Sequence, residues 1–148
     1  MNHSTHYGSD KQVNGVLFSP DGNTLFASGL NNKISSWNSY CGTLSQRQFN
    51  NFYHVNKKLK PIQMACTLDN ILFHPSDDGS VFGYSVQSGE LIAHLKGHLD
   101  ATFAVGLDEA KDRILTASFK DGVYAWDIDD RPPITHALID DDAIDVWD

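Results

Sequence analysis

Three side chains near the end of the sequence are of types that can share hydrogen bonds with one another. His98 follows a glycine, Ser118 closes a short apolar run, and Trp126 is followed by an aspartate. An imidazole and a hydroxyl both donate and accept hydrogen bonds, whereas an indole only donates. We interpret His98 as a structural histidine that bonds within its own unit of the fold, not as a catalyst or a metal ligand.

Two short strands must position these side chains. The run Ile114-Leu-Thr-Ala-Ser118 predicts one strand and Val123-Tyr-Ala-Trp126 predicts the returning strand. Lys120-Asp-Gly122 between them is a tight-turn signal, because glycine tolerates a positive φ. The order from Gly97-His98 to Trp126-Asp127 is typical of one propeller blade, the WD repeat, whose period is about 40–45 residues.

In such a blade the histidine, a serine or threonine, an aspartate and the tryptophan form a hydrogen-bonded lock between strands. Ser118 and Trp126 fall in place, but Lys120 occupies the expected aspartate position and Asp121 comes one residue late. The sequence therefore predicts a damaged lock in which the Trp126 indole N–H lacks its partner. Trp126 is then either a core residue or a partner-binding anchor.

The residues next to this lock are further candidates for binding a partner. Ser118 and Phe119 lie beside Trp126 in the predicted turn. They are expected to be core residues if Trp126 is one, and to contact the partner if Trp126 does. Asp100 follows Gly97-His98 closely and is a candidate for the loop face of the blade. The alternative for Asp100 is a solvated turn residue.

Two earlier stretches repeat the same order of strands and turns. Val13–Phe18, Thr24–Ser28 and Ile34–Trp37 predict one blade, and Asn70–His74, Val81–Tyr84 and Leu91–Leu95 predict another. The aromatic residues Trp37, Tyr84 and Trp126 recur at separations of 47 and 42 residues, which indicates a repeat. Ser76, Asp78 and Tyr84 have the spacing of a regular blade. The predicted structural lock residues are Trp37, Ser76, Asp78, Tyr84, His98 and Ser118.

The predicted fold is all-β: a partial WD-repeat β-propeller of about three four-stranded blades. Their expected ranges are 13–53, 54–95 and 96–128, between a polar segment at 1–12 and an acidic tail at 129–148. Propellers contain about four to eight blades. We therefore expect the C-terminal arc of a seven-bladed ring, present as a truncated product, as a short isoform or as a chain that a partner completes. A fragment that does not fold alone is the remaining alternative.

Composition excludes several classes of function. The chain has 148 residues, a net charge of −8 and a pI near 5.1, which disfavours direct binding to nucleic acid. Cys41 and Cys66 fit no metal-ligand pattern and are expected to be reduced thiols. No apolar run approaches the ~20 residues that span a bilayer. We expect no enzyme, cofactor, metal, small molecule or membrane contact, because neither a nucleophile elbow nor a glycine-rich loop before a helix is present.

Two charged segments have open interpretations. The cluster of Lys57, Lys58 and Lys60 is either a solvated loop or a contact for an acidic partner. The tail holds Asp140, Asp141 and Asp142 and ends near Trp147. It is either a disordered solubilising tail or a short motif in which Trp147 anchors a basic partner.

The order of these repeats resembles the Cockayne syndrome group A protein family over nearly the whole chain. The more specific matches are Trp37-Asn-Ser39, the segment around Lys57-Lys58, and Ser88-Gly-Glu90 followed by Leu95-Lys-Gly-His98. Val13-Asn-Gly15, Asp21-Gly22, Ala125-Trp126 and Ala143-Ile-Asp-Val-Trp147 are further matches.

This resemblance implies a nuclear, non-enzymatic substrate receptor of a cullin-4 ubiquitin ligase in transcription-coupled nucleotide excision repair. The implied partners are the cullin-4 ligase adaptor and repair factors associated with RNA polymerase II. The family docks to the adaptor through an N-terminal helical segment and nearby blades, which we do not find in this sequence. A generic WD-repeat adaptor in another pathway, such as RNA processing, is the alternative.

Overall fold

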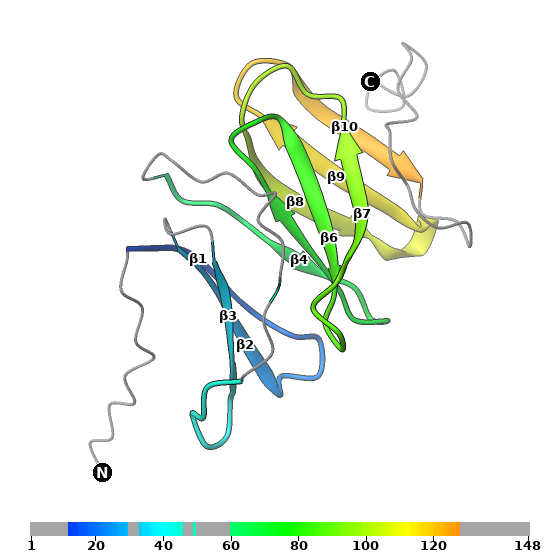
Figure 1. The fold of residues 1–148 in the computed structure, drawn as a ribbon. Coiled ribbons are helices and arrows are strands. Elements are labelled where there is room, and N and C mark those ends of the chain that lie inside the picture. Colours follow the sequence, from blue (N-terminus) through cyan, green and yellow to red (C-terminus); the bar gives the residue numbers. More distant parts are fainter. Residues whose placement is uncertain (1–11, 30–32, 46–48, 50–59, 128–148) are drawn as a thin grey trace.

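The computed structural model describes residues 12–29, 33–45, 49 and 60–127, and these form three antiparallel sheets (Figure 1). The first sheet has the order β1-β2-β3, the second β4-β5-β6-β7 and the third β10-β9-β8. The strands are β1 (Val13–Phe18), β2 (Thr24–Gly29), β3 (Ile34–Asn38), β4 (Ala65–Cys66), β5 (Ile71–Pro75), β6 (Ser80–Ser85), β7 (Leu91–Lys96), β8 (Thr102–Asp108), β9 (Arg113–Ser118) and β10 (Gly122–Asp127). A short 3-10 helix, η1 (Glu109–Lys111), joins β8 to β9.

Each sheet is a meander in which consecutive strands pair, as the alternation of strand and turn signals predicts. Gly22 and Gly122 adopt φ values of 75° and 81° in their turns, a region that glycine enters without steric cost. A fourth strand of the first sheet begins as a single bridge between Trp37 and Leu44. The predicted blade boundaries at 53 and 128 lie outside the described residues.

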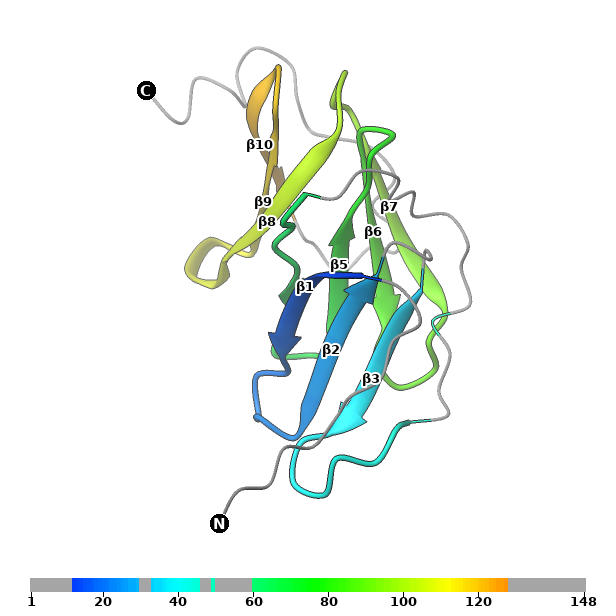
Figure 2. The same cartoon turned by 90° about the vertical axis from the view of Figure 1, so that its left-hand side faces the viewer.

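The middle sheet is buried on both faces, because the other two sheets pack against it (Figure 2). Alternate residues point to opposite faces of a strand, so neighbours such as Leu72 and Phe73 enter different cores. One core joins this sheet to the first and contains Phe26, Ile34, Phe49, Met64, Cys66, Leu72, Phe82 and Tyr84. The other core joins it to the third and contains Ala65, Phe73, Val81, Leu95, Val105, Ile114 and Trp126.

Part of one face of the first sheet is exposed to solvent. Leu17 and Phe26 are paired neighbours that turn towards the middle sheet. Val16 and Phe18, on the opposite face of β1, are 64% and 57% exposed. An apolar sheet face normally packs against another layer. The three sheets are therefore an arc of stacked blades with an apolar face at its first edge.

Candidate protein-interaction surface

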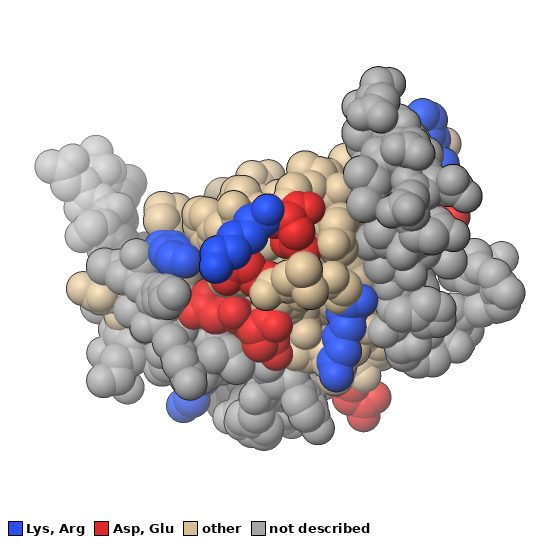
Figure 3. All heavy atoms as spheres, turned by 90° about the horizontal axis from the view of Figure 1, so that it is seen from above, with Lys and Arg blue, Asp and Glu red and all other residues tan. Residues whose placement is uncertain are grey.

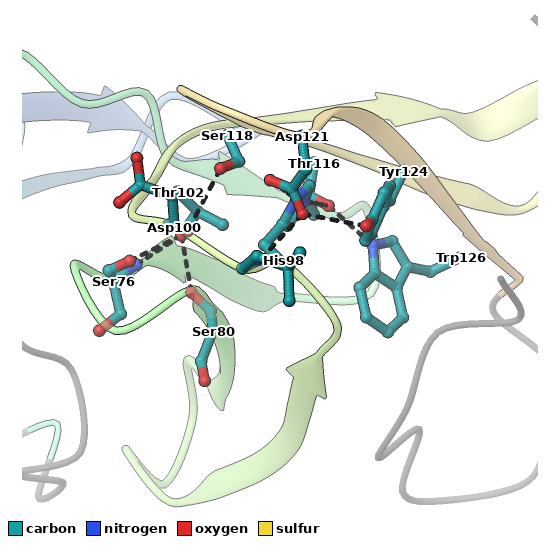
Figure 4. Close-up of polar contacts among 11 residues, drawn as sticks. Ser76, Ser80, His98, Asp100, Thr102, Thr116, Ser118, Asp121, Tyr124 and Trp126 are labelled. Carbon is teal, nitrogen blue, oxygen red and sulfur yellow. Dashed lines mark hydrogen bonds and ion pairs between the residues drawn. The ribbon is translucent and has the colours of Figure 1, made fainter. Parts of the chain in front are cut away.

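Three connections meet at one end of the second and third blades, the upper end in Figure 1. They are the β5–β6 turn, the β7–β8 connection that carries His98, and the β9–β10 turn that carries Asp121. The side chains beneath them form a hydrogen-bonded cluster (Figure 4). Because the strands below are buried, this cluster fixes the shape of the surface above it.

Four side chains of the third blade form an unbroken lock. The Trp126 indole N–H donates to the Thr116 hydroxyl over 2.8 Å, and Thr116 Oγ1 lies 2.7 Å from His98 Nε2. His98 Nδ1 lies 3.2 Å from Asp121 Oδ1. An ionised carboxylate only accepts, so Nδ1 carries the proton and Nε2 accepts from Thr116. Each donor in the series therefore has one acceptor.

Burial and hydrogen bonding set the charges in this lock. Burial is the main cause that lowers the pKa of His98, although its contact with Asp121 acts in the opposite direction. His98 is 8% exposed, and its ring stacks on Tyr124 with centroids 4.0 Å apart. The imidazole is thus neutral at neutral pH, as the direction of its hydrogen bonds requires.

Asp121 stays ionised because several donors converge on it. Partial burial would raise its pKa, but the nearby Ser118 hydroxyl and hydrogen bonds from the Leu99 N–H, Tyr124 and His98 hold it well below the usual range. The Leu99 N–H and the Tyr124 hydroxyl donate to Oδ2 over 2.8 and 2.9 Å. One carboxylate therefore ties the β7–β8 connection to strand β10.

The prediction of a damaged lock is wrong. Asp121 supplies the carboxylate although it lies one residue beyond the expected position, and Lys120 is exposed. Thr116, which the sequence analysis missed, supplies the joining hydroxyl in place of Ser118. Trp126 is 0% exposed and its N–H has a partner, so in this arc it does not face solvent as a partner-binding anchor would.

Ser118 is not part of the lock but helps to hold the β7–β8 connection in place. Its hydroxyl donates to the Asp100 carbonyl over 3.2 Å, and the Phe119 N–H donates to the Ala101 carbonyl over 3.3 Å. Both bonds hold the β7–β8 connection against the end of β9. A signal for Thr116 was available, since Thr116 and Ser118 are two residues apart and share a face of the strand.

A second cluster clasps the second blade to the third. The Thr102 hydroxyl accepts from the Ser76 N–H over 2.9 Å and lies 2.7 Å from the Ser80 carbonyl, to which it donates. The Thr102 N–H also donates to the Ser76 carbonyl over 3.0 Å. Gly79, with φ of 87°, lies so close to the next blade that a Cβ there would be 2.5 Å from the His98 carbonyl oxygen.

The other predicted lock residues occupy separate places. Ser76 is buried in the clasp, and Asp78 Oδ1 accepts from the Ser80 N–H over 2.9 Å within the β5–β6 turn. Tyr84 is fully buried in the first core, edge-to-face with Phe49 at 6.0 Å. Trp37 is 3% exposed on β3 of the first blade.

Above the lock lies a mixed apolar and charged surface, which we call the loop surface and define as Lys60, Leu99, Asp100 and Phe119. The Leu99 and Phe119 side chains are 89% and 53% exposed. Phe119 packs on Phe103 with ring centroids 4.5 Å apart, and Lys60 Nζ lies 4.2 Å above its ring. The ring is therefore held in place while one part of it faces solvent.

Charges of both signs lie close together at this end of the molecule, which Figure 3 shows from above. Exposed apolar anchors inside a charged rim are the usual anatomy of a protein-binding patch. The predicted binding candidates Phe119 and Asp100 lie on this surface, and their role in binding stays a prediction. Trp147 lies outside the described residues.

The described part of the chain holds no cluster of three potential metal ligands. Cys41 is exposed and Cys66 is buried, and neither is in a disulfide. In the described ranges no helix has the length and apolar character of a membrane span.

The stacked antiparallel blades and the His98 lock define a partial WD-repeat β-propeller. Two solved structures are similar to it: "Structure of U3-55K", with a TM-score of 0.68 and 17% identity, and "Crystal structure of RRP9 WD40 repeats", with a TM-score of 0.65 and 19% identity. Each match covers 82% of this chain and 37% of the other chain. These likenesses show the fold.

A sequence match reaches Autophagy-related protein 16 of Arabidopsis thaliana, with 24% identity over 115 residues. It covers 76% of this chain and 21% of that protein, so the chain spans about a fifth of the relative's length. No family model matches the chain. The specific resemblance to the Cockayne syndrome group A family has no support among these comparisons.

Proposed function

We propose that this chain is a non-enzymatic scaffold that binds a protein partner through the loop surface. The observation that carries the proposal is the Phe119 ring, which is half exposed yet fixed by Phe103 below and Lys60 above. A rigid aromatic side chain costs little conformational entropy when a partner covers it, and such residues often dominate binding energy. Leu99, whose N–H donates to Asp121 in the turn that follows Phe119, adds a second exposed apolar residue.

The test is quantitative affinity purification with the tagged chain and a matched pair of variants. Phe119→Ala removes the fixed ring of the loop surface. Tyr40→Ala removes an aromatic ring that is 85% exposed on the first blade, away from the lock. A partner of the loop surface is lost with Phe119→Ala and retained with Tyr40→Ala. If every captured protein responds equally to both variants, the proposal fails.

Within this role, we propose that the chain is a nuclear substrate receptor of a cullin-4 ubiquitin ligase in transcription-coupled repair. The support is the sequence resemblance at Trp37-Asn-Ser39 and Leu95-Lys-Gly-His98. Capture from irradiated nuclei should then enrich cullin-4 subunits and elongating RNA polymerase II over untreated nuclei. Imaging of the tagged chain should place it in the nucleus. Equal recovery with and without irradiation would contradict this proposal.

A second candidate is a scaffold role in autophagy, which the likeness to part of Autophagy-related protein 16 favours. The same purification from starved and fed cells separates it from the repair role, because autophagy proteins should then enrich on starvation. In both candidate functions the propeller arc binds a protein partner and catalyses no reaction. The two captures therefore differ in the identity of the partner alone.

A further inference from the structure

A groove lies at the end of the second and third blades opposite the loop surface. One wall is the β4–β5 turn, residues 67–69, and the other is the connection from β8 through η1 to β9, at 107–109 and 112–113. The loop surface adjoins the end of β5 and the start of β8. This groove adjoins the start of β5 and the end of β8, so the two sites are separate.

The groove has a largely apolar lining. Leu68 contributes a side chain that is 71% exposed, and Leu107 packs at the edge of the core below. Backbone bonds hold both walls: the Asn70 N–H donates to the Thr67 carbonyl over 3.0 Å, and the Asp112 N–H donates to the Glu109 carbonyl over 3.4 Å. The site is therefore largely formed before any partner arrives.

Carboxylates flank this apolar lining on both sides. One wall carries Asp69, and the other carries Asp108, Glu109 and Asp112. The cation in the lining, Arg113, is committed to Asp127 at 3.4 Å. No three of the described carboxylates, histidines or cysteines are grouped as a metal site. The arrangement complements a cationic side chain on an aliphatic stem, and the chain's net charge of −8 draws such partners.

We propose that this groove binds a lysine- or arginine-bearing segment of a partner protein. The aliphatic stem packs on Leu68, as long cationic side chains do on apolar surfaces, and its head meets the carboxylates of both walls. A leucine beside the cation fits the exposed apolar floor. This site is independent of the loop surface, and it gives the arc two binding faces.

Peptide binding to the purified chain tests this site directly. The probe is an immobilised peptide of alternating lysine and leucine, read by biolayer interferometry. Two reference peptides replace lysine by glutamine or leucine by serine. The lysine–leucine peptide should bind most tightly, and raising the salt concentration should weaken it, because the carboxylates are solvent-exposed. Equal binding of the lysine and glutamine peptides overturns the proposal.

Matched variants locate the binding on the chain. Asp69→Asn with Glu109→Gln removes one charge from each wall and should weaken binding about five- to twentyfold, the sum of two exposed charge contacts. Asp100→Asn with Asp77→Asn removes the same net charge at the opposite end of these blades and should leave binding unchanged. If both double variants weaken the peptide equally, the attraction is to the overall charge and the site does not exist. Phe119→Ala should have no effect, which separates this site from the loop surface.

Discussion

The Thr116 hydroxyl accepts the Trp126 indole N–H over 2.8 Å in a part of the third blade where both residues are almost fully buried. The same hydroxyl donates onward to His98. A single oxygen therefore satisfies two buried ring nitrogens: it accepts a hydrogen bond from Trp126 Nε1 and donates one to His98 Nε2. Removing that oxygen leaves both nitrogens without a partner in the apolar interior.

Thr116→Val should destabilise the chain strongly. Valine keeps the shape of threonine, but it leaves the Trp126 N–H and the His98 Nε2 unsatisfied, at about 1–3 kcal/mol for each buried group. Urea unfolding followed by circular dichroism measures the loss in the free energy of unfolding. Thr116→Ser keeps the hydroxyl and should lose much less. Equal losses for serine and valine would show that the methyl group matters more than the hydrogen bonds.

Asp121 and Lys120 should differ sharply in their contribution to stability. Asp121→Ala removes the acceptor of the hydrogen bonds from His98, Leu99 and Tyr124. A hydrogen bond to a charged group contributes about 1.5–3 kcal/mol to the free energy of unfolding. Lys120→Ala changes an exposed side chain and should stay within about 0.5 kcal/mol. The comparison uses the same urea titration. A larger loss for Lys120→Ala would place the functional turn residue at 120 after all.

Stability should fall as the solution becomes acidic. The pKa of His98 is lowered from 6.5 by burial, so below about pH 7 the unfolded chain binds a proton that the folded chain refuses. His94 acts in the same direction, because burial and Lys96 lower its pKa as well. Asp121 adds a second loss as the pH falls through and below 3.8, where its carboxylate protonates more readily in the unfolded chain.

Unfolding titrations at several pH values above and below 6.5 check this dependence. His98→Gln should give a less stable chain whose stability changes less between neutral and mildly acidic pH. His94 remains in that variant, so part of the slope should persist. An unchanged slope would show that His98 takes up its proton equally well in both states.

Gly79 and Gly22 form a matched pair for substitution by alanine. Both have positive φ, 87° and 75°, so alanine is strained at either position by about 1 kcal/mol. A Cβ at Gly79 also meets the His98 carbonyl oxygen at 2.5 Å, whereas nothing lies within 4 Å of one at Gly22. Gly79→Ala should therefore lower the melting temperature much more than Gly22→Ala. Equal shifts would mean that the blades separate easily at this point.

Local signals predicted most strands well. Val13–Phe18 was predicted with the bounds of β1, because a proline-aspartate-glycine turn follows it directly. Strand β8 was not predicted. In its run Thr102-Phe-Ala-Val-Gly-Leu-Asp108 the small residues Ala104 and Gly106 weaken the strand signal. Its place is fixed by distant partners, because the Val105 N–H donates to the Gln63 carbonyl over 2.9 Å. Contacts of this kind are not visible in the local sequence.

The sequence predicted that a hydrogen-bonded lock exists in the third blade, but not which residues supply its hydroxyl and its carboxylate. His98 and Trp126 were predicted from the repeat, whereas the choice between Thr116 and Ser118 depends on how far the indole reaches across two paired strands. The choice between Lys120 and Asp121 depends on the geometry of the turn that ends at Gly122. In both cases a shift of one or two residues decides which side chain points inward.

The unequal distribution of tryptophan gives the arc a built-in optical asymmetry. Trp37 is buried in the first blade and Trp126 in the third, while the middle blade has Tyr84 at the corresponding position. Indole emission depends on the polarity around the ring, so it reports the two outer blades and is nearly silent for the middle one. A variant with Trp37→Phe and Trp147→Phe would leave Trp126 as the single indole, which reports the third blade. The opening of that blade from the arc could then be followed separately from the rest.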